Sequence, residues 1–287
     1  MPELPEVETV VRDLRPMLVG RAVVGLELGG RKLRRPWDAA WSARVVGQRF
    51  EAVRRRGKWI LLDLHAGPRL VVHLGMTGQF TVTPAARERP DHLHVVFALD
   101  DGHELRFRDI RRFGSVELLA DEAAALAYLG PKLGPEPFDI PAGHFHDAVT
   151  GTGRTLKAIL LDQTVVAGVG NIYADEALHR AGLHPETRGQ ALTRPQVERL
   201  RAAVTAVIAH AIEGRGSTIR DYVGGSGLRG NFQKEFRVYG RTGEACPGCG
   251  HPVEMVRVAG RASHHCPACQ PPTKAALRAK RAKRAGA

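Results

Sequence analysis

The sequence predicts an α+β protein of several domains, with a strand-rich N-terminal domain and its flanking helices, a helical domain and a small metal-binding segment. Three observations lead to this fold class. Short runs of Val, Leu, Ile and Phe alternate with Gly, Pro and Asp turns in the N-terminal half. Helical spacing of apolar residues follows a Pro- and Gly-rich stretch. The only four cysteines form two CxxC pairs near the C-terminal end of the 287-residue chain.

The first predicted element is a helix from about Pro5 to Leu18. Its buried face consists of Val7, Val10, Val11, Leu14, Met17 and Leu18. Pro5 suits a first helical position, and an acidic residue such as Glu6 is favoured in a first turn by the helix dipole. Pro2 and Glu3 precede this helix, which does not explain them.

Pro2 and Glu3 indicate covalent chemistry. Removal of Met1, which aminopeptidases generally accept before proline, exposes a secondary amine beside a carboxylate. An α-amino group has a pKa of about 7.7–8.0, so an appreciable fraction is uncharged and nucleophilic at neutral pH. The alternative is that both residues only lead into the helix, and on these residues alone that interpretation is favoured.

Strands of a sandwich or a barrel are predicted next. They are short, apolar and bounded by turn residues, and they cover 59–64, 69–74, 94–99, 104–108 and 115–119. The segment 130–137 that follows is rich in Pro and Gly, so it propagates neither helix nor sheet and is predicted to be a linker.

Beyond the linker the predicted elements are helices. Segments 155–161 and 172–181 have helical periodicity. Thr193 and Gln196 form a capping box at the start of a longer helix, and Gly214 ends it. The buried stripe of this helix consists of Val197, Leu200, Val204, Val207, Ile208 and Ala211. The second domain is therefore predicted to be helical.

The four cysteines have the spacing of a tetrahedral zinc site in two knuckles, predicted to be two hairpins between about 236 and 270. They are Cys246, Cys249, Cys266 and Cys269. Because four thiolates leave no open coordination position, a Zn²⁺ ion held here is structural. The loop between the knuckles presents Arg257 and Arg261, which either reach phosphates or lie on a solvated face.

The formal net charge of +12 indicates a polyanionic partner, for which nucleic acid is the commonest candidate. The last fourteen residues hold six basic side chains and no acidic one, and subtracting these six charges leaves +6 on the rest of the chain. The sequence contains no run of eighteen apolar residues and no signal segment. A cytoplasmic protein without a membrane partner is therefore expected.

Two turns carry bulky apolar residues in a Gly-containing context. Met76 lies in the segment His73–Gly78, and Phe113 lies in Asp109–Gly114. Enzymes that extract a base need such wedges to fill the stack. The alternative, that both residues cap the core, has equal weight here.

Two further motifs leave alternatives open. The cationic run 54–58 either lies along a polyanion or is a solvated strand end, and the second interpretation is favoured. The segment Gly168–Asn171 lacks a dinucleotide fingerprint because Tyr173 occupies the third glycine position. It either supplies backbone N–H groups to a phosphate or simply connects two helices.

Taken together, these motifs resemble those of the bacterial formamidopyrimidine-DNA glycosylase family. The resemblance is carried in order by 2–9, 57–58, 73–78, 111–114, 168–173 and the four cysteines, and it runs from Pro2 to about Gln270. It implies a catalytic β-sandwich domain at 1–130, a helix-two-turn-helix domain at 131–235, a zinc finger at 236–270 and, outside the pattern, a basic tail at 271–287.

The resemblance implies a bifunctional DNA glycosylase and abasic-site lyase. The expected partner is double-stranded DNA containing oxidised purines, such as 8-oxoguanine and formamidopyrimidines, and the expected state is a monomer. Pro2 is implied to attack the sugar C1′ and form a Schiff base, with Glu3 as acid or base and Glu6 positioning the sugar. Lys58 is implied to assist β-elimination, and Arg261 to assist δ-elimination.

The resemblance also implies contacts with DNA. An intercalating set fills the place of the flipped nucleotide, and it consists of Met76, Arg111 and Phe113. Phosphate contacts are implied for His92, Lys157 and Asn171. The segment 218–233 matches a loop that covers the flipped base.

Two competing interpretations remain at this point. The endonuclease VIII class shares the proline terminus and the finger but prefers oxidised pyrimidines, whereas the Leu4–Thr9 stretch and the intercalating set favour the purine branch. The second competitor is a zinc-finger DNA-binding protein without catalysis, which a retained Met1 would support because it blocks the amine.

Overall fold

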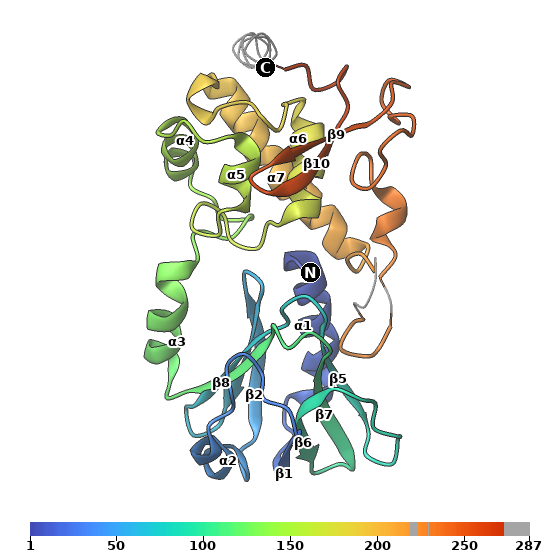
Figure 1. Cartoon of the computed structure of the whole chain (residues 1–287). Coiled ribbons are helices and arrows are strands. Elements are labelled where there is room, and N and C mark those ends of the chain that lie inside the picture. Colours follow the sequence, from blue (N-terminus) through green and yellow to red (C-terminus); the bar gives the residue numbers. More distant parts are fainter. Residues whose placement is uncertain (219–222, 229, 273–287) are drawn as a thin grey trace. The chain divides into compact units, whose positions relative to one another are not determined.

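The structure is a computed structural model that describes residues 1–218, 223–228 and 230–272. The chain forms two compact units. The first contains Met1–Lys132 and Ala211–Gln233, and the second contains Leu133–His210 and Lys234–Ala287. Figure 1 shows the elements of both units along the chain.

The first unit is built from two four-stranded antiparallel sheets. One sheet has the strand order β1 (Val23–Leu28), β6 (Leu93–Leu99), β7 (His103–Asp109) and β5 (Gly78–Pro84). The other has the order β2 (Phe50–Arg56), β3 (Trp59–Leu64), β4 (Arg69–His73) and β8 (Ser115–Leu119). Helix α1 (Leu4–Leu18) packs against strands of both sheets.

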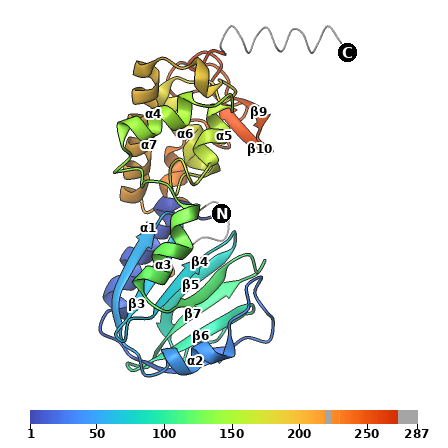
Figure 2. The same cartoon turned by 90° about the vertical axis from the view of Figure 1, so that its left-hand side faces the viewer.

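A single apolar core joins the two sheets and α1. Phe80, Phe97 and Phe107 enter it from one sheet, and Ile60 and Leu62 enter it from the other. On the apolar face of α1, Met17 is only partly buried, whereas the other residues predicted for this face belong to the same core and are fully buried, namely Val7, Val10, Val11, Leu14 and Leu18. The sheets therefore form a β-sandwich, which confirms the predicted fold class. Helix α2 (Ala39–Val45) and helix α3 (Glu122–Leu129) complete the unit, with α3 against β4 and β8 (Figure 2).

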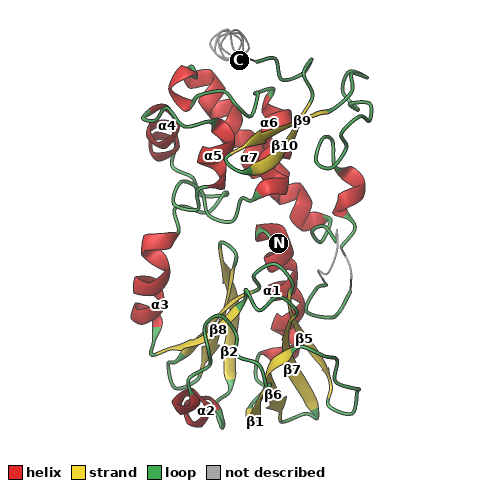
Figure 3. Cartoon of the chain, viewed as in Figure 1, coloured by secondary structure: helices red, strands yellow, loops and turns green. Residues whose placement is uncertain are grey.

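In its described residues, the second unit contains helices and one hairpin as its regular elements (Figure 3). Its helices are α4 (Ala142–Thr150), α5 (Leu156–Leu161), α6 (Asn171–Ala181) and α7 (Arg194–Glu213), the last three residues of which belong to the first unit. The hairpin consists of β9 (Glu254–Val258) and β10 (Arg261–His265). Of the 3-10 turns in the described residues, η1 (Gly130–Lys132) belongs to the first unit, η2 (Gly189–Ala191) belongs to the second, and η3 (Phe232–Glu235) crosses the boundary between them in the sequence.

The structure differs from the sequence-based expectations at several elements. The cationic run 54–58 lies partly inside β2, where Arg54 pairs with Asp63 at 2.8 Å and Arg55 pairs with Glu8 at 2.8 Å. The expected linker begins with the 3-10 turn η1, because Pro131 fits a first helical turn. Of the two hairpins expected around the cysteines, the described residues form one regular hairpin, and a single bridge between Ala245 and Pro252 stands in place of the other.

None of the helices within the described ranges is both long enough and apolar enough to cross a membrane.

Replacement of Leu14 by Ala is expected to lower the free energy of unfolding of the first unit by about 2–5 kcal/mol, because it removes a fully buried side chain and leaves a cavity. The matched control is Leu126→Ala in α3, whose side chain is 66% exposed, and its effect is expected to stay within about 0.5 kcal/mol. Urea unfolding of both variants makes the comparison. Equal losses would contradict the core assigned here.

Candidate active site and metal centre

The N-terminus of α1 buries two carboxylates beside Pro2. Glu3 is the N-cap of the helix, and its N–H donates to Glu6 Oε2 at 2.8 Å. Glu3 is 2% exposed and Glu6 is 1% exposed, and Pro2 is also buried. A helix N-terminus favours negative charge because its first N–H groups have no partner in the helix. The two carboxylates therefore lie where the fold stabilises them, directly after the candidate nucleophile.

The carboxylate of Glu6 also binds a segment that is distant in sequence. Ser217 donates to Glu6 Oε1 through its backbone N–H at 2.8 Å and its hydroxyl at 3.1 Å. The preceding Gly216 has φ +69°, and a Cβ there would lie 2.9 Å from Glu6 Oε1. The buried side chain of Glu6 thus links Glu3, the residue after Pro2, to Ser217. Only glycine fits at position 216.

The segment after Ser217 is closed at its base. Ser217 forms a β-bridge with Asn231, and Gly230 N–H donates to Thr218 Oγ1 at 2.9 Å. Part of the loop expected at 218–233, namely 219–222 and 229, lies outside the described residues.

A second attachment of this segment to α1 was not predicted from the sequence. Arg215 Nη2 lies 2.9 Å from both carboxylate oxygens of Asp13, and the Ser226 hydroxyl donates to Asp13 Oδ2 at 2.8 Å. Glu6 and Asp13 both belong to α1. The helix that carries the N-terminus therefore holds this segment at two places.

Lys58 lies at the turn between β2 and β3 and is 7% exposed. Its positive charge acts on His73 of β4, whose pKa is lowered to about 4, mainly by burial and then by Lys58 and Arg35. Nδ1 of His73 accepts the N–H of Gly75 at 3.0 Å, so the proton of the neutral ring lies on Nε2. The structure thus brings Lys58 close to His73 and to the turn that follows it.

Asp109 organises the two turns that carry the expected wedges. It is fully buried, and it accepts the Thr77 hydroxyl at 2.5 Å, the Gly114 N–H at 2.7 Å and the Arg111 N–H at 3.2 Å. Thr77 belongs to the turn of Met76, and Gly114 and Arg111 flank Phe113. A single carboxylate therefore fixes both turns relative to each other.

The wedge side chains themselves point away from the core. Met76 is 38% exposed and Phe113 is 47% exposed, which argues against core caps. The guanidinium carbon of Arg111 lies 4.7 Å from the centre of the Phe113 ring, within the range of a cation–π contact. His92, a predicted phosphate contact, is a non-glycine residue with φ 66°, and its carbonyl accepts the N–H of Asp109 at 3.1 Å.

In the second unit, the predicted phosphate contacts Lys157 and Asn171 are neighbours. Lys157 is fully buried, and its Nζ binds Asp175 Oδ1 at 2.5 Å and the carbonyl of Asn171 at 2.8 Å. Asn171 is the first residue of α6, and Gly170 is its N-cap. The turn before α6 is held by the amide of Gln163, which accepts Gly168 N–H at 3.0 Å.

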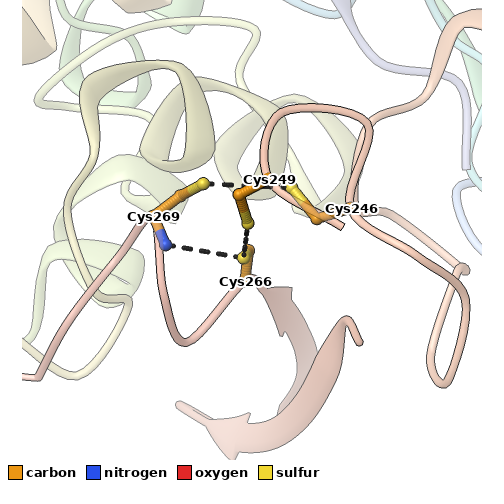
Figure 4. Close-up of side chains that lie close together, drawn as sticks. All are labelled: Cys246, Cys249, Cys266 and Cys269. Carbon is orange, nitrogen blue, oxygen red and sulfur yellow. Dashed lines mark hydrogen bonds between the residues drawn. The ribbon is translucent and has the colours of Figure 1, made fainter. Parts of the chain in front are cut away.

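The four cysteine sulfurs converge as the sequence spacing predicts (Figure 4). They lie within 4.8 Å of one another, with 3.9 Å between Cys246 and Cys269 and 3.4 Å between Cys249 and Cys266. A tetrahedral Zn²⁺ with Zn–S bonds near 2.3 Å requires sulfur separations of about 3.8 Å. The cluster therefore fits zinc. His179 of α6 adds a contact of 3.4 Å from Nε2 to Cys246 Sγ.

A buried carboxylate of α6, that of Glu176, joins the finger to this helix. Glu176 accepts the N–H groups of Arg237, Val238 and Tyr239 at 3.0, 3.0 and 2.9 Å. Burial raises the pKa of Glu176, and these three hydrogen bonds act in the opposite direction. Arg261 is exposed at the start of β10, directly after a turn in which Ala259 and Gly260 have positive φ.

The predicted catalytic and binding residues are divided between the two units. The first unit contains Pro2, Glu3, Glu6, Lys58, Met76, His92, Arg111 and Phe113. The second contains Lys157, Asn171, Arg261 and the four cysteines. Sequence reasoning missed the acceptors that position them, namely Asp109, Asp175 and Glu176. An Asp two residues before an N–H donor is a known turn signal, and Asp109 with Arg111 shows that spacing.

Three protein-family models match the chain. The formamidopyrimidine-DNA glycosylase N-terminal domain matches residues 1–116, and the H2TH domain of the same glycosylase matches 133–223. The zinc finger found in FPG and IleRS matches 243–272. Together with the cysteine geometry, this last match shows that the chain binds one structural zinc ion.

The chain is similar to curated proteins over most of its length. It is 46% identical to the formamidopyrimidine-DNA glycosylase of Chloroflexus aggregans, over 89% of this chain and 94% of that protein. It is 45% identical to the protein of the same name from Geobacillus kaustophilus, over 88% and 94%.

Solved structures show the same likeness. A Lactococcus lactis FPG mutant in complex with Fapy-dG containing DNA superposes with a TM-score of 0.88 at 34% identity, and the match covers 94% of this chain and all of that one. MutM in complex with carbocyclic 8-oxo-G containing DNA superposes with a TM-score of 0.87 at 34% identity, with 94% of this chain and 100% of that chain covered.

Replacement of Gly216 by Ala is expected to destabilise the first unit more than replacement of Gly227. Both glycines have positive φ, so each change costs about 1–2 kcal/mol of backbone strain. Only at 216 does the new Cβ also meet the Glu6 carboxylate, whereas nothing lies within 4 Å at 227. Chemical unfolding of the two variants measures the difference. If Gly227→Ala costs as much, Glu6 does not constrain this backbone.

The depressed pKa of His73 makes folding pH-dependent. Because the folded state holds this ring neutral down to about pH 4, the unfolded state binds the proton first as the pH falls below about 6.5. Stability contributed by His73 is therefore fully present above pH 6.5 and is lost progressively between pH 6.5 and 4. Unfolding free energies across this window should show a smaller slope for His73→Asn than for the natural protein. An unchanged slope in His73→Asn would contradict the assignment of this pH dependence to the buried His73 ring.

Proposed function

The chain belongs to the formamidopyrimidine-DNA glycosylase family, and we propose that it is a DNA glycosylase of base excision repair that also cleaves the strand at the abasic site it creates. The proposed substrates are oxidised purines in double-stranded DNA, such as 8-oxoguanine and formamidopyrimidines. The observation that carries this proposal is the buried position of Pro2 directly before two buried carboxylates, Glu3 and Glu6.

The proposed reaction begins at the amine of Pro2 after loss of Met1. The amine attacks C1′ of the damaged nucleotide, the bond from C1′ to the base breaks, and the base leaves with a proton. Glu3 donates a proton to the sugar ring oxygen as the ring opens, which leaves an iminium link between Pro2 and C1′. Glu6, held by Ser217 and by the N–H of Glu3, positions Glu3 beside the sugar.

Strand cleavage follows from the iminium. This electron sink acidifies C2′, whose proton is removed as the 3′ phosphate leaves in β-elimination, and we assign Lys58 to assist this step. Loss of the 5′ phosphate in δ-elimination is assigned to Arg261. Hydrolysis of the remaining iminium releases the sugar fragment and restores the Pro2 amine.

The proposed DNA contacts follow from exposure and charge. Met76, Arg111 and Phe113 form an exposed wedge fixed by Asp109, suited to fill the gap left by a flipped nucleotide. His92 and Asn171 are assigned to phosphates. Lys157 is also assigned to a phosphate. Because its side chain is fully buried and its Nζ pairs with Asp175, a phosphate can meet this ammonium group only where it already lies.

The proposed organisation follows the family. We propose a catalytic domain at 1–130, a helix-two-turn-helix domain at 131–235 and a zinc finger at 236–270, each of which carries residues with a proposed role. The zinc ion fixes the ends of the hairpin that carries Arg261. The basic segment 271–287 lies, from 273 on, outside the described residues, and we assign it nonspecific DNA affinity. We propose that the protein acts as a monomer in the bacterial cytoplasm.

The test is borohydride reduction of the protein mixed with a duplex containing 8-oxoguanine, followed by mass mapping of the adduct. We expect an adduct on Pro2, since reduction converts the iminium to a stable amine. Pro2→Gly should abolish most base excision and trapping while it retains DNA binding. Cys249→Ser should weaken binding and cleavage together, because it destabilises the finger.

Other outcomes would replace the proposal. Tight binding with Met1 absent and no adduct would indicate a noncatalytic damage binder. An adduct formed only with an oxidised pyrimidine would assign the protein to endonuclease VIII chemistry. Equal loss of DNA affinity in both variants would contradict the separate roles given to Pro2 and the finger.

A further inference from the structure

Helix α6 binds the edge of β10 that does not pair with β9. Asn171 Nδ2 donates to the carbonyl of Ala262 at 3.1 Å, and the N–H of His264 donates to Asp175 Oδ2 at 2.9 Å. Asn171 and Asp175 are four residues apart, so they lie on one helix face about 6 Å apart along the axis. Ala262 and His264 are two residues apart, which is about 6.7 Å along a strand. Two helix side chains therefore take the place of a neighbouring strand.

Asp175 has more partners than this edge contact. It is fully buried, and besides the His264 N–H it accepts Lys157 Nζ at 2.5 Å and His264 Nδ1 at 3.1 Å. The carboxylate has two oxygens with two acceptor sites each, so all three donors can be satisfied together. A neutral amide or a shorter side chain cannot replace it, because the buried ammonium group of Lys157 needs a negative partner.

These contacts bear on Arg261 through the geometry of the hairpin. Arg261 begins β10, one residue before the first anchored position and three before the second. Its other neighbours are the turn residues Ala259 and Gly260, both with positive φ. Anchors at Ala262 and His264 fix the direction and the face of the strand from which Arg261 extends. Two of the zinc ligands, Cys246 and Cys249, precede β9, and the next ligand along β10 is Cys266, on the far side of the anchors from Arg261.

We propose that Asp175 is a positioning residue that sets the Arg261 hairpin on α6 and holds Lys157 beside it. This inference rests on the proposed role of Arg261 in δ-elimination. It states that the zinc ion alone does not orient Arg261, and that a carboxylate outside the finger is needed as well.

The test is Asp175→Asn, compared with the natural protein for base excision, product ends and zinc content. A single-turnover assay on an 8-oxoguanine duplex should show base excision within about twofold of the natural rate. The ratio of δ- to β-elimination products should fall roughly 10-fold to 100-fold, as expected when a catalytic group is displaced by about 1 Å. One zinc per chain should remain, and hydrogen exchange at 262–265 should become faster. Asp147→Asn, at a side chain 83% exposed on α4, is the control and should keep the natural ratio.

A second variant tests the same inference without an unpaired buried ammonium group at Lys157, which would favour misfolding. Lys157→Met combined with Asp175→Ala removes both buried charges, and Lys157→Met alone is its reference. The double variant should show the same fall in the product ratio relative to that reference, with zinc retained. An unchanged ratio in either comparison, in folded protein with zinc bound, would overturn the inference.

Arg261→Ala separates this inference from the function on which it rests. If Arg261→Ala leaves the product ratio unchanged, the proposed role of Arg261 fails. If Arg261→Ala lowers the ratio and the Asp175 variants do not, the role of Arg261 stands and the positioning by Asp175 is wrong.

Discussion

Buried carboxylates that accept main-chain N–H groups are the constraint on which the site depends. Glu6, Asp109, Asp175 and Glu176 are each at most 5% exposed. A buried carboxylate is costly unless every oxygen finds a donor. In each case at least one donor is a backbone N–H of another segment, a turn or loop for Glu6, Asp109 and Glu176 and strand β10 for Asp175, so the position of that backbone is set by the carboxylate. The residues expected to touch DNA or the reacting sugar lie on or beside these turns.

The contacts of these carboxylates are long-range in sequence, so they tie loops to rigid elements that lie far away along the chain. Glu6 reaches Ser217, and Glu176 reaches the segment 237–239. Asp175 reaches His264. Loops are usually the most mobile parts of a protein, and rigid elements must position them if they are to carry function. Here the rigid elements are α1 and α6. Helix α1 supplies Glu6 from its first turn, and α6 supplies Asp175 and Glu176 from the residues that follow its first turn.

The sequence predicted what local patterns encode. Apolar runs bounded by turn residues predicted the ends of β3 and β8. A capping box and an apolar stripe predicted the long helix α7, and the CxxC spacing predicted the cysteine cluster. Strand β2 was missed because its arginines are compensated only in the folded state, by Asp63 and Glu8. Helix α3 was missed because it is rich in Ala and lacks a clear apolar stripe. The contacts of Asp175 could not be predicted, since β10 reaches it only through tertiary structure.

The division of the first unit into two stretches of chain affects the order of its maturation. Glu6 emerges from the ribosome before Ser217, which is 211 residues further along the chain. At typical elongation rates of about 5–20 residues per second, the α1 carboxylate waits roughly 10–40 s for this partner. During that interval the N-terminus lacks the segment that later binds beside it. The proposed removal of Met1 therefore has a window on the nascent chain, before the fold that buries Pro2 is complete.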